Sequence, residues 1–353
     1  MSEEHQPISR ASLGVAAFST VVEWYDFTLY LYFATVLSRV FFGGGAASLL
    51  ATLAGFAIAY LMEGAKPSRR GLVASFASAS SEVGGLLAVA VSALTVSLMS
   101  QADLDSWGWR IPFFVGAAIA ASVWVARATM EESPEFERQL AAGTVPESPL
   151  RHTLANHRAG IARAFAISAL GSVTYYVGIT YVPAFLTSAG KLSEAMSLWL
   201  ATIAALVVIL VTPPIGAWSD RVGRRTVLIT LAIASAILPI TMFALMASGS
   251  SNLALVGAVV LAAVAGGVSA VGAVTTAEQV PGEGRLTALA LGATGATAIF
   301  GGLTPWLAQY LVERTGWSMA PGAMIAVIAL CVLPVLLRLP ETAPYARPRP
   351  TPR

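Results

Sequence analysis

The stretch that decides the fold runs from Ser197 to Ala247 and reads SLWLATIAALVVILVTPPIGAWSDRVGRRTVLITLAIASAILPITMFALMA. Two apolar runs, Ser197–Trp218 and Thr226–Ala247, flank a short polar turn that carries three arginines. Each run is long enough to cross a bilayer core of about 30 Å as a helix. Between them, Gly216–Arg225 has the pattern G-x-x-x-D-R-x-G-R-R, in which the aspartate can cap the next helix and pair with an arginine. The stretch therefore predicts two membrane-spanning helices joined by a charged turn.

The composition of the whole chain extends this prediction. Of its 353 residues, 56% are hydrophobic and only 11% are charged, and the mean hydropathy is +0.72. An ordinary soluble domain carries roughly a quarter charged residues, which it needs to cover its surface. The balance excludes a soluble enzyme, a nucleic-acid-binding protein and a disordered chain, and it predicts an integral membrane protein whose partner is the lipid bilayer.

Few residues offer catalytic or metal chemistry. Cys331 is the only cysteine and lies in an apolar run, while His5, His152 and His157 all fall in polar segments. There is no disulfide framework, no metal-ligand set, no nucleophile–base set and no ATP-binding P-loop motif. We therefore expect no enzyme, no metal and no cofactor, and any work must draw on a gradient or on a partner.

Hydrophobic runs of about 17–28 residues recur along the chain and predict an all-α polytopic protein with ten spans. The predicted spans are Leu13–Val40, Gly45–Met62, Leu72–Met99, Ile111–Ala128, Ile161–Leu186, Ser197–Trp218, Thr226–Ala247, Leu253–Ala277, Leu286–Leu311 and Met319–Leu337. With the N-terminus inside and alternating loops, 17 of the 21 Lys and Arg residues fall inside and 4 fall outside. This bias predicts that both termini are cytoplasmic.

The longest polar stretch divides the chain into two lobes. We assign 1–128 to an N-terminal lobe of about four spans, 129–160 to a cytoplasmic linker, 161–338 to a C-terminal lobe of six spans and 339–353 to a disordered cytoplasmic tail. Matching pairs, such as Glu63 with Arg70 and Glu278 with Arg285, suggest that the lobes are repeats, as in many transporters. Their spacing implies that the first lobe lacks about 60 residues, or two spans, before Glu63.

Three acidic residues lie inside the predicted spans, namely Glu23, Asp26 and Glu82. Glu23 and Glu82 are each ten residues into a span, about 15 Å deep, and Asp26 shares a helix face with Glu23. No Lys, Arg or His lies at matching depth, so reversible protonation is the natural way to accommodate these carboxylates, as proton coupling requires. Two structural alternatives stay open: a permanently protonated Glu82 bonded to nearby serines, and a polar helix–helix seam at Glu23 and Asp26.

The second lobe has no charged residue deep inside its predicted spans, since Arg163 lies at the very start of one, so its polar residues at depth are neutral. Tyr175 and Tyr176 lie 14–15 residues into their span. This is too deep for the aromatic belt at the membrane surface. We predict that they line a cavity. The charged turn Gly216–Arg225 has a plainer alternative as well, which is to anchor the topology only.

The decapeptide Gly216–Arg225 resembles the conserved cytoplasmic loop of the major facilitator superfamily. Glu23-Trp24-Tyr25-Asp26-Phe27 is similar to the opening motif of the metabolite:proton symporter branch of that superfamily. Further stretches similar to this branch, in the same order along the chain, are Arg69-Arg70-Gly71, Trp107–Phe113, Glu132-Ser133-Pro134-Glu135-Phe136 and Phe300–Pro305. The resemblance implies a bacterial inner-membrane protein with twelve helices in two six-helix lobes. The missing two spans and the absent first-lobe copy of the loop are departures from that plan.

The resemblance also implies a function, namely uptake of small polar metabolites such as citrate, 2-oxoglutarate, shikimate, proline or betaine. We expect a proton symporter that works by alternating access. Its proton-coupling residues would be Glu23, Asp26 and Glu82. Cavity-lining residues would be Trp24, Tyr25, Tyr175 and Tyr176, and the cytoplasmic gate would be formed by Gly216, Asp220, Arg221, Gly223, Arg224 and Arg225. The alternative is a truncated relative that no longer transports.

Overall fold

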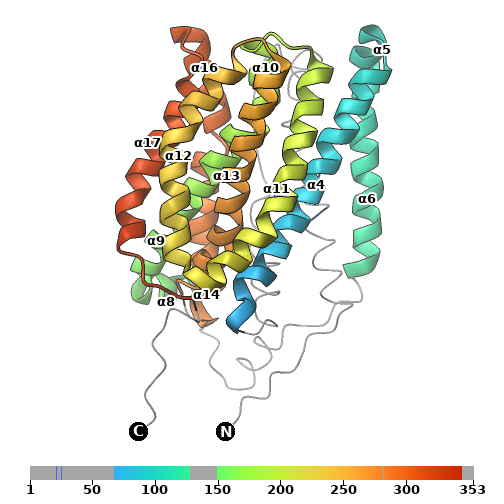
Figure 1. The fold of residues 1–353 in the computed structure, drawn as a ribbon. Coiled ribbons are helices and arrows are strands. Elements are labelled where there is room, and N and C mark those ends of the chain that lie inside the picture. The colour runs from blue at the N-terminus through green and yellow to red at the C-terminus, as the bar shows by residue number, and fades with distance from the viewer. Residues whose placement is uncertain (1–20, 22–24, 26–66, 128–148, 281, 344–353) are drawn as a thin grey trace, which may run out of the picture.

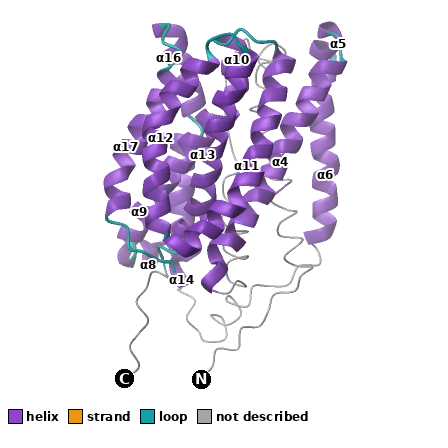
Figure 2. Ribbon diagram, viewed as in Figure 1, coloured by secondary structure: helices purple, strands orange, loops and turns teal. Residues whose placement is uncertain are grey.

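The computed structural model describes Val21, Tyr25 and residues 67–127, 149–280 and 282–343. Every regular element within these ranges is a helix, which confirms the all-α prediction (Figure 2). The first range holds the 3-10 turn η2 (Pro67–Arg69), α4 (Arg70–Leu98), α5 (Gln101–Ser106), the 3-10 turn η3 (Gly108–Arg110) and α6 (Ile111–Arg127). The two predicted spans Leu13–Val40 and Gly45–Met62 lie outside the described residues, apart from Val21 and Tyr25.

The remaining ranges form a larger bundle that begins inside the predicted linker. Its elements are α8 (Pro149–Asn156), α9 (Arg158–Tyr175), the π-helix η4 (Tyr176–Thr180), α10 (Val182–Ser188), α11 (Glu194–Val222), α12 (Arg224–Met246), α13 (Ser251–Ala277), α14 (Gly282–Leu289), the π-helix η5 (Ala290–Thr294), α15 (Gly295–Phe300), α16 (Thr304–Thr315) and α17 (Ala320–Leu337).

The helices agree with the predicted spans wherever the structure describes them. Six are long and apolar enough to cross a bilayer, and the pair formed by 158–180 and α10, bent by 44°, makes a seventh. The predicted span Ile111–Ala128 corresponds to α6, an apolar helix of 17 residues. Apart from Glu82 in the middle of α4, charged residues lie near the ends of these helices, because lipid offers no partner to a charge.

Small residues let the central helices approach one another closely. α13 lies between α11, α12 and α9, and it buries Ala254, Ala258, Ala262 and Ala265 at helical spacing. Interfaces between helices in lipid depend on such close packing, because lipid tails are as apolar as leucine side chains. α11 packs along α4, so a helix of the first lobe is joined to the second lobe over much of its length (Figure 1).

The segment that follows α17 differs from the prediction. Residues 339–353 were assigned to a disordered tail, but Leu339 and Ala343 are buried and Glu341 accepts backbone hydrogen bonds from α12. The Pro-rich composition predicts disorder because composition describes only the local chain. It does not reveal the contact between Glu341 and α12 that orders residues 339–343. Residues 344–353 lie outside the described part of the chain.

Gly322 provides a test of helix packing between α17 and α12. A Cβ atom at this position would stand 2.5 Å from the carbonyl oxygen of Pro239 and 2.7 Å from the Cα of Ile240. We expect Gly322→Ala to lower the free energy of unfolding by about 1–3 kcal/mol, because backbone atoms cannot yield cheaply. Reversible unfolding in SDS mixed micelles measures the change.

The matched control is Gly295→Ala, since a Cβ atom there meets no heavy atom within 4 Å. Gly295 starts α15 with helical backbone angles, so alanine should be neutral or stabilising by up to about 1 kcal/mol. Equal effects of the two substitutions would contradict the close α12–α17 contact.

Candidate functional site

Glu82 is a carboxylate buried at the boundary between the lobes. It lies in the middle of α4, and only 4% of its surface is exposed. Tyr175, at the end of α9, is close enough to interact with the Glu82 side chain. Tyr176, the first residue of η4, is close enough to interact electrostatically with the same carboxylate. Three residues that were predicted as functional from separate lobes therefore meet at one place.

The two tyrosine rings form a compact aromatic wall beside Glu82. They are both buried, and they pack edge to face with ring centroids 5.5 Å apart and an interplanar angle of 76°. Gly301 leaves room for this arrangement, because a Cβ atom there would stand 2.6 Å from a ring carbon of Tyr176. Gly301 belongs to the Phe300–Pro305 stretch of the family resemblance, and the structure shows the contact that needs a glycine there.

A break in the helix follows the tyrosines directly. η4 adds a π-turn at Tyr176–Thr180, and the chain then bends by 44° into α10. Single π-turns inside helices are frequent at functional sites, because the extra residue re-aims neighbouring side chains. The break therefore places Tyr175 and Tyr176 where the path of the second-lobe helix changes.

Of the first predicted span, Leu13–Val40, the structure describes only Val21 and Tyr25. Tyr25 is fully buried, and its hydroxyl donates a hydrogen bond of 2.7 Å to the carbonyl oxygen of Pro112. Its ring packs with Ala88 and Val89 of α4 and with Leu198 of α11, which indicates a packing role. Glu23, Asp26 and Trp24 lie outside the described residues.

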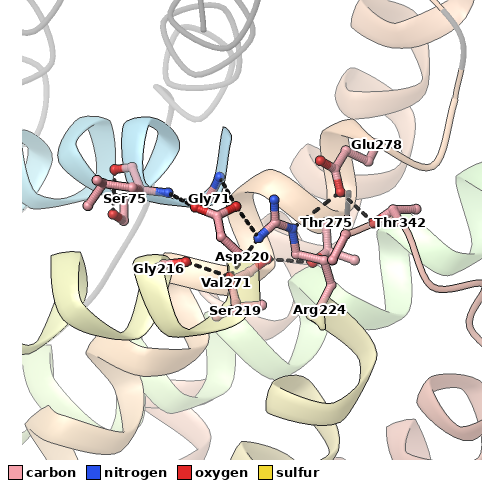
Figure 3. A network of polar contacts seen from close by, with 12 residues as sticks. Gly71, Ser75, Gly216, Ser219, Asp220, Arg224, Val271, Thr275, Glu278 and Thr342 are labelled. Carbon is pink, nitrogen blue, oxygen red and sulfur yellow. Dashed lines mark hydrogen bonds and ion pairs between the residues drawn. The ribbon is translucent and has the colours of Figure 1, made fainter. Parts of the chain in front are cut away.

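A second polar cluster ties α4 to α11 at the end of the bundle that the charge pattern assigns to the cytoplasm. The carboxylate of Asp220 accepts hydrogen bonds of 2.9 Å from the amides of both Gly71 and Leu72, at the start of α4 (Figure 3). It also forms an ion pair of 2.8 Å with Nη1 of Arg224. The arginine pairing agrees with the sequence prediction, but the capped helix is α4 and not the next helix, α12.

Arg224 is fully buried and links Asp220 to further partners. Nη1 donates to Oγ of Ser219 at 2.8 Å, and Nε lies 3.4 Å from a carboxylate oxygen of Glu278. Glu278 in turn accepts a hydrogen bond from the hydroxyl of Thr342 (Figure 3). A buried guanidinium is accommodated only when acceptors surround it, and these residues supply acceptors to Nε and Nη1. We refer to Asp220, Arg224 and Glu278 as the junction cluster.

The N-terminus of α12 is capped from a distant part of the chain. Gly223, with φ of +114°, makes the short turn between α11 and α12 but has no side chain to cap the helix. Glu341 takes this role, since its carboxylate accepts from the amides of Arg224 at 2.8 Å and Arg225 at 3.1 Å. The side chain of Arg221 is exposed, whereas that of Arg224 is fully buried, so these two arginines of the predicted gate motif lie in different environments.

Close backbone contact makes the junction possible. A Cβ atom on Gly216 would stand 2.5 Å from Cβ of Ser75 and 2.7 Å from the carbonyl oxygen of Gly71. Glycine at 71 and 216 therefore lets α4 reach Asp220. The sequence did not predict the contacts that Gly71, Glu278, Thr342 and Glu341 make at this junction. Glu278 does belong to the internal repeat, and Gly71 belongs to a stretch of the family resemblance.

The junction cluster yields a stability prediction. Asp220→Ala leaves the Arg224 guanidinium and the amides of Gly71 and Leu72 without their carboxylate. We expect the free energy of unfolding to fall by about 3–5 kcal/mol, the usual cost of breaking a buried ion pair. Reversible unfolding in SDS mixed micelles measures it. Arg221→Ala is the control, since an exposed side chain should matter by less than about 0.5 kcal/mol, and a similar loss in both variants would contradict the assignment.

Comparisons with known proteins agree with this arrangement of helices. Residues 169–353 match the sequence profile of the Major Facilitator Superfamily, and residues 15–145 match that of the Sugar (and other) transporter family. Among solved structures, the proton:xylose symporter XylE superposes with a TM-score of 0.62 at 16% identity, covering 94% of this chain and 85% of that one. FucP in its outward conformation gives a TM-score of 0.57 at 14% identity, over 93% and 86% of the two chains.

Curated relatives are more similar in sequence. The citrate-proton symporter of Klebsiella pneumoniae is 32% identical over 78% of this chain and 62% of its own length. The alpha-ketoglutarate permease of Escherichia coli is 32% identical over 73% of this chain and 59% of its own. The proline/betaine transporter of Salmonella typhimurium is 28% identical over 80% and 58%. The chain therefore spans about three fifths of the length of these relatives.

Proposed function

This chain belongs to the major facilitator superfamily, and we propose that it is a secondary active transporter that moves a small organic solute together with protons by alternating access. The curated relatives named above are symporters, permeases and transporters of carboxylates or of proline and betaine. Proton coupling, the gate and the site residues in this chain are our proposals. The transport-inactive alternative gains no support from these comparisons.

The observation that carries the proposal is the position of Glu82 against Tyr175 and Tyr176. A carboxylate buried in a membrane helix is expensive to keep ionised without a basic partner, so it is a natural proton carrier. Because Glu82 belongs to the first lobe and both tyrosines belong to the second, a rocking motion of the lobes changes what surrounds the carboxylate. Protonation and lobe movement are then linked at one contact, as a symporter requires.

The junction cluster supports the proposal of a gate at the cytoplasmic end. Asp220 of α11 holds the start of α4 through two amides, so the two lobes are fastened together at that end. The positive end of the α4 helix dipole favours the Asp220 carboxylate there. Breaking these bonds would separate α4 from α11 and open a path from the cytoplasm. We propose a bacterial inner-membrane location with both termini inside, from the 17:4 distribution of basic residues.

Proton coupling is tested by Glu82→Gln in proteoliposomes under an imposed pH gradient. The probes are labelled citrate, 2-oxoglutarate, proline and glycine betaine. For the solute that the unsubstituted protein takes up, we expect gradient-driven uptake to fall at least about tenfold, while solute exchange without a gradient persists, because glutamine keeps the shape but cannot release a proton.

Glu313→Gln is the matched control, since Glu313 is exposed and bonds to Gln309, which a glutamine can also do. It should transport as the unsubstituted protein does. Uptake that responds neither to the gradient nor to Glu82→Gln would exclude the proposed proton role.

The gate is tested by the reactivity of an introduced cysteine. Ser75 is fully buried at the α4–α11 contact, so Ser75→Cys in a Cys331→Ala background should react slowly with a thiol reagent. Adding Asp220→Asn weakens the hold on α4, and we expect labelling to quicken severalfold. Ser100→Cys, at an exposed position beyond the far end of α4, should label at the same rate in both backgrounds. Unchanged labelling at position 75 would contradict the gate.

A further inference from the structure

A row of buried hydroxyl groups follows one face of α4 between the junction cluster and Glu82. The face is formed by Gly71, Ser75, Ser78 and Glu82. These positions are four, three and four residues apart, a spacing that places them one above the other on a helix. Ser75 is fully buried, and only 5% of Ser78 is exposed. Phe76, which is exposed beside them, is apolar, so the hydroxyls lie on the protein side of α4 and away from lipid.

Both ends of this face contact the second lobe. At one end, Gly216 of α11 lies directly against the hydroxyl of Ser75, with no room for a Cβ atom between them. At the other end, Glu82 interacts with Tyr175 of α9. Ser78 lies between Ser75 and Glu82 on the same face. The row of hydroxyls therefore follows the boundary between the two lobes.

The hydroxyls lie on only one side of Glu82. Toward the other end of α4, the next residues on the same face are Leu86 and Val89, which are apolar, and Val89 is fully buried. The distribution of basic residues assigns the Ser75 end of the helix to the cytoplasm. The polar face therefore leads from Glu82 toward the cytoplasm and not toward the outer surface.

The surface beside the hydroxyls is apolar and closely packed. Ala74, next to Ser75, is fully buried in a cluster with Val274 of α13 and Leu289 of α14. Aliphatic side chains have no atom that accepts a proton or a hydrogen bond. On this side of the boundary, the hydroxyls of α4 are therefore the groups that a proton leaving Glu82 can follow.

Serine hydroxyls can pass a proton onward, because each donates one hydrogen bond and accepts others. Ser75 donates to the carbonyl oxygen of Leu72 at 2.6 Å, which leaves its own lone pairs able to accept. Within the described residues, the structure gives the hydroxyl of Ser78 no hydrogen bond. Side chains three or four residues apart on a helix are about 5–6 Å apart, so one water molecule between neighbours completes a hydrogen-bonded file.

We propose that Ser78 and Ser75 relay the proton that Glu82 releases to the cytoplasm, and that the junction cluster closes this path. The inference rests on the proposed function, in which Glu82 carries the proton. The O–H bond of the Glu82 carboxyl group breaks, and each water and hydroxyl along the file accepts one proton and passes one on. A cytoplasmic water receives the last proton. Glu82 is left as a carboxylate, and both serines are left unchanged.

The contact between α4 and α11 determines when the relay works. While Asp220 holds the first amides of α4, Gly216 lies too close to Ser75 to admit water between the helices. Withdrawal of α4 from Asp220 lets water reach Ser75. Proton release therefore waits until the cytoplasmic end opens, so protons do not leak through the closed gate.

The experiment compares gradient-driven uptake with solute exchange by the full chain in proteoliposomes. The probes are labelled citrate, 2-oxoglutarate, proline and glycine betaine. Net uptake requires Glu82 to release its proton in every cycle, whereas exchange lets the loaded carrier return with its proton. For the solute that is taken up, we expect Ser75→Ala combined with Ser78→Ala to lower net uptake at least about tenfold, more so in D2O, and to leave exchange unchanged.

Two comparisons separate the hydroxyl from helix packing, for which small side chains also serve in membrane helices. Ser92→Ala removes a fully buried hydroxyl on the outer side of Glu82, where it donates to the carbonyl oxygen of Ala88, and should leave uptake and exchange unchanged. Ser78→Thr and Ser78→Val introduce side chains of similar shape, and only threonine has a hydroxyl. The threonine variant should keep at least about tenfold more net uptake than the valine variant.

The possible outcomes distinguish a failed relay from a failed transport proposal. Equal losses of uptake and exchange in the double alanine variant would indicate packing and overturn the relay. Full gradient-driven uptake by that variant would overturn it as well. In both cases the unsubstituted protein still transports, so the proposed function stands. If the unsubstituted protein shows no gradient-driven uptake, the proposed function fails, and the relay fails with it because there is no proton to release.

Discussion

Much of the described structure depends on one buried interaction, in which the Asp220 carboxylate is shared between the Arg224 guanidinium and two amides at the start of α4. Within lipid or a tightly packed protein interior, neither charge would be tolerated alone. Several sequence features serve this interaction. Gly71 and Gly216 allow the backbones to approach, and Glu278 takes up a further donor of Arg224. The junction therefore explains why a short turn between two spans carries so specific a pattern.

Glu82 shows the opposite way to handle a charge at depth. Asp220 has fixed partners on every side, whereas the sequence places no basic residue within reach of Glu82 along α4. A buried carboxylate without a fixed positive partner is accommodated at least cost when it carries a proton. Fixed partners therefore hold the charges of the junction in place, whereas in the proposed function Glu82 is neutralised by a proton that it can release.

The sequence was informative wherever a pattern was local, and less so for contacts between distant segments. Apolar runs predicted the spans, and the depth of Glu82, Tyr175 and Tyr176 pointed to the site that the structure assembles. The prediction that Asp220 caps the next helix, α12, was wrong. Local rules favour the adjacent helix, whereas the amides that donate to Asp220 lie 148 and 149 residues away in the sequence. Glu341 was assigned to disorder for the same reason. Because Gly223 has no side chain, the first amides of α12 need an acceptor from elsewhere, but the sequence does not reveal which acidic residue supplies it.

The two polar sites are connected by α4, which runs without interruption from Arg70 to Leu98. Leu72 and Glu82 are ten residues apart on this helix, or about 15 Å. A tilt of α4 that withdraws its first amides from Asp220 therefore also moves Glu82 relative to the tyrosines. The facing segment of the second lobe is built differently, since η4 and a bend of 44° interrupt it just beyond Tyr175. An unbroken helix moves as a rigid body, whereas a broken helix can bend at its break. When α4 tilts, we therefore expect the backbone to change conformation mainly in the α9–α10 segment and not within α4.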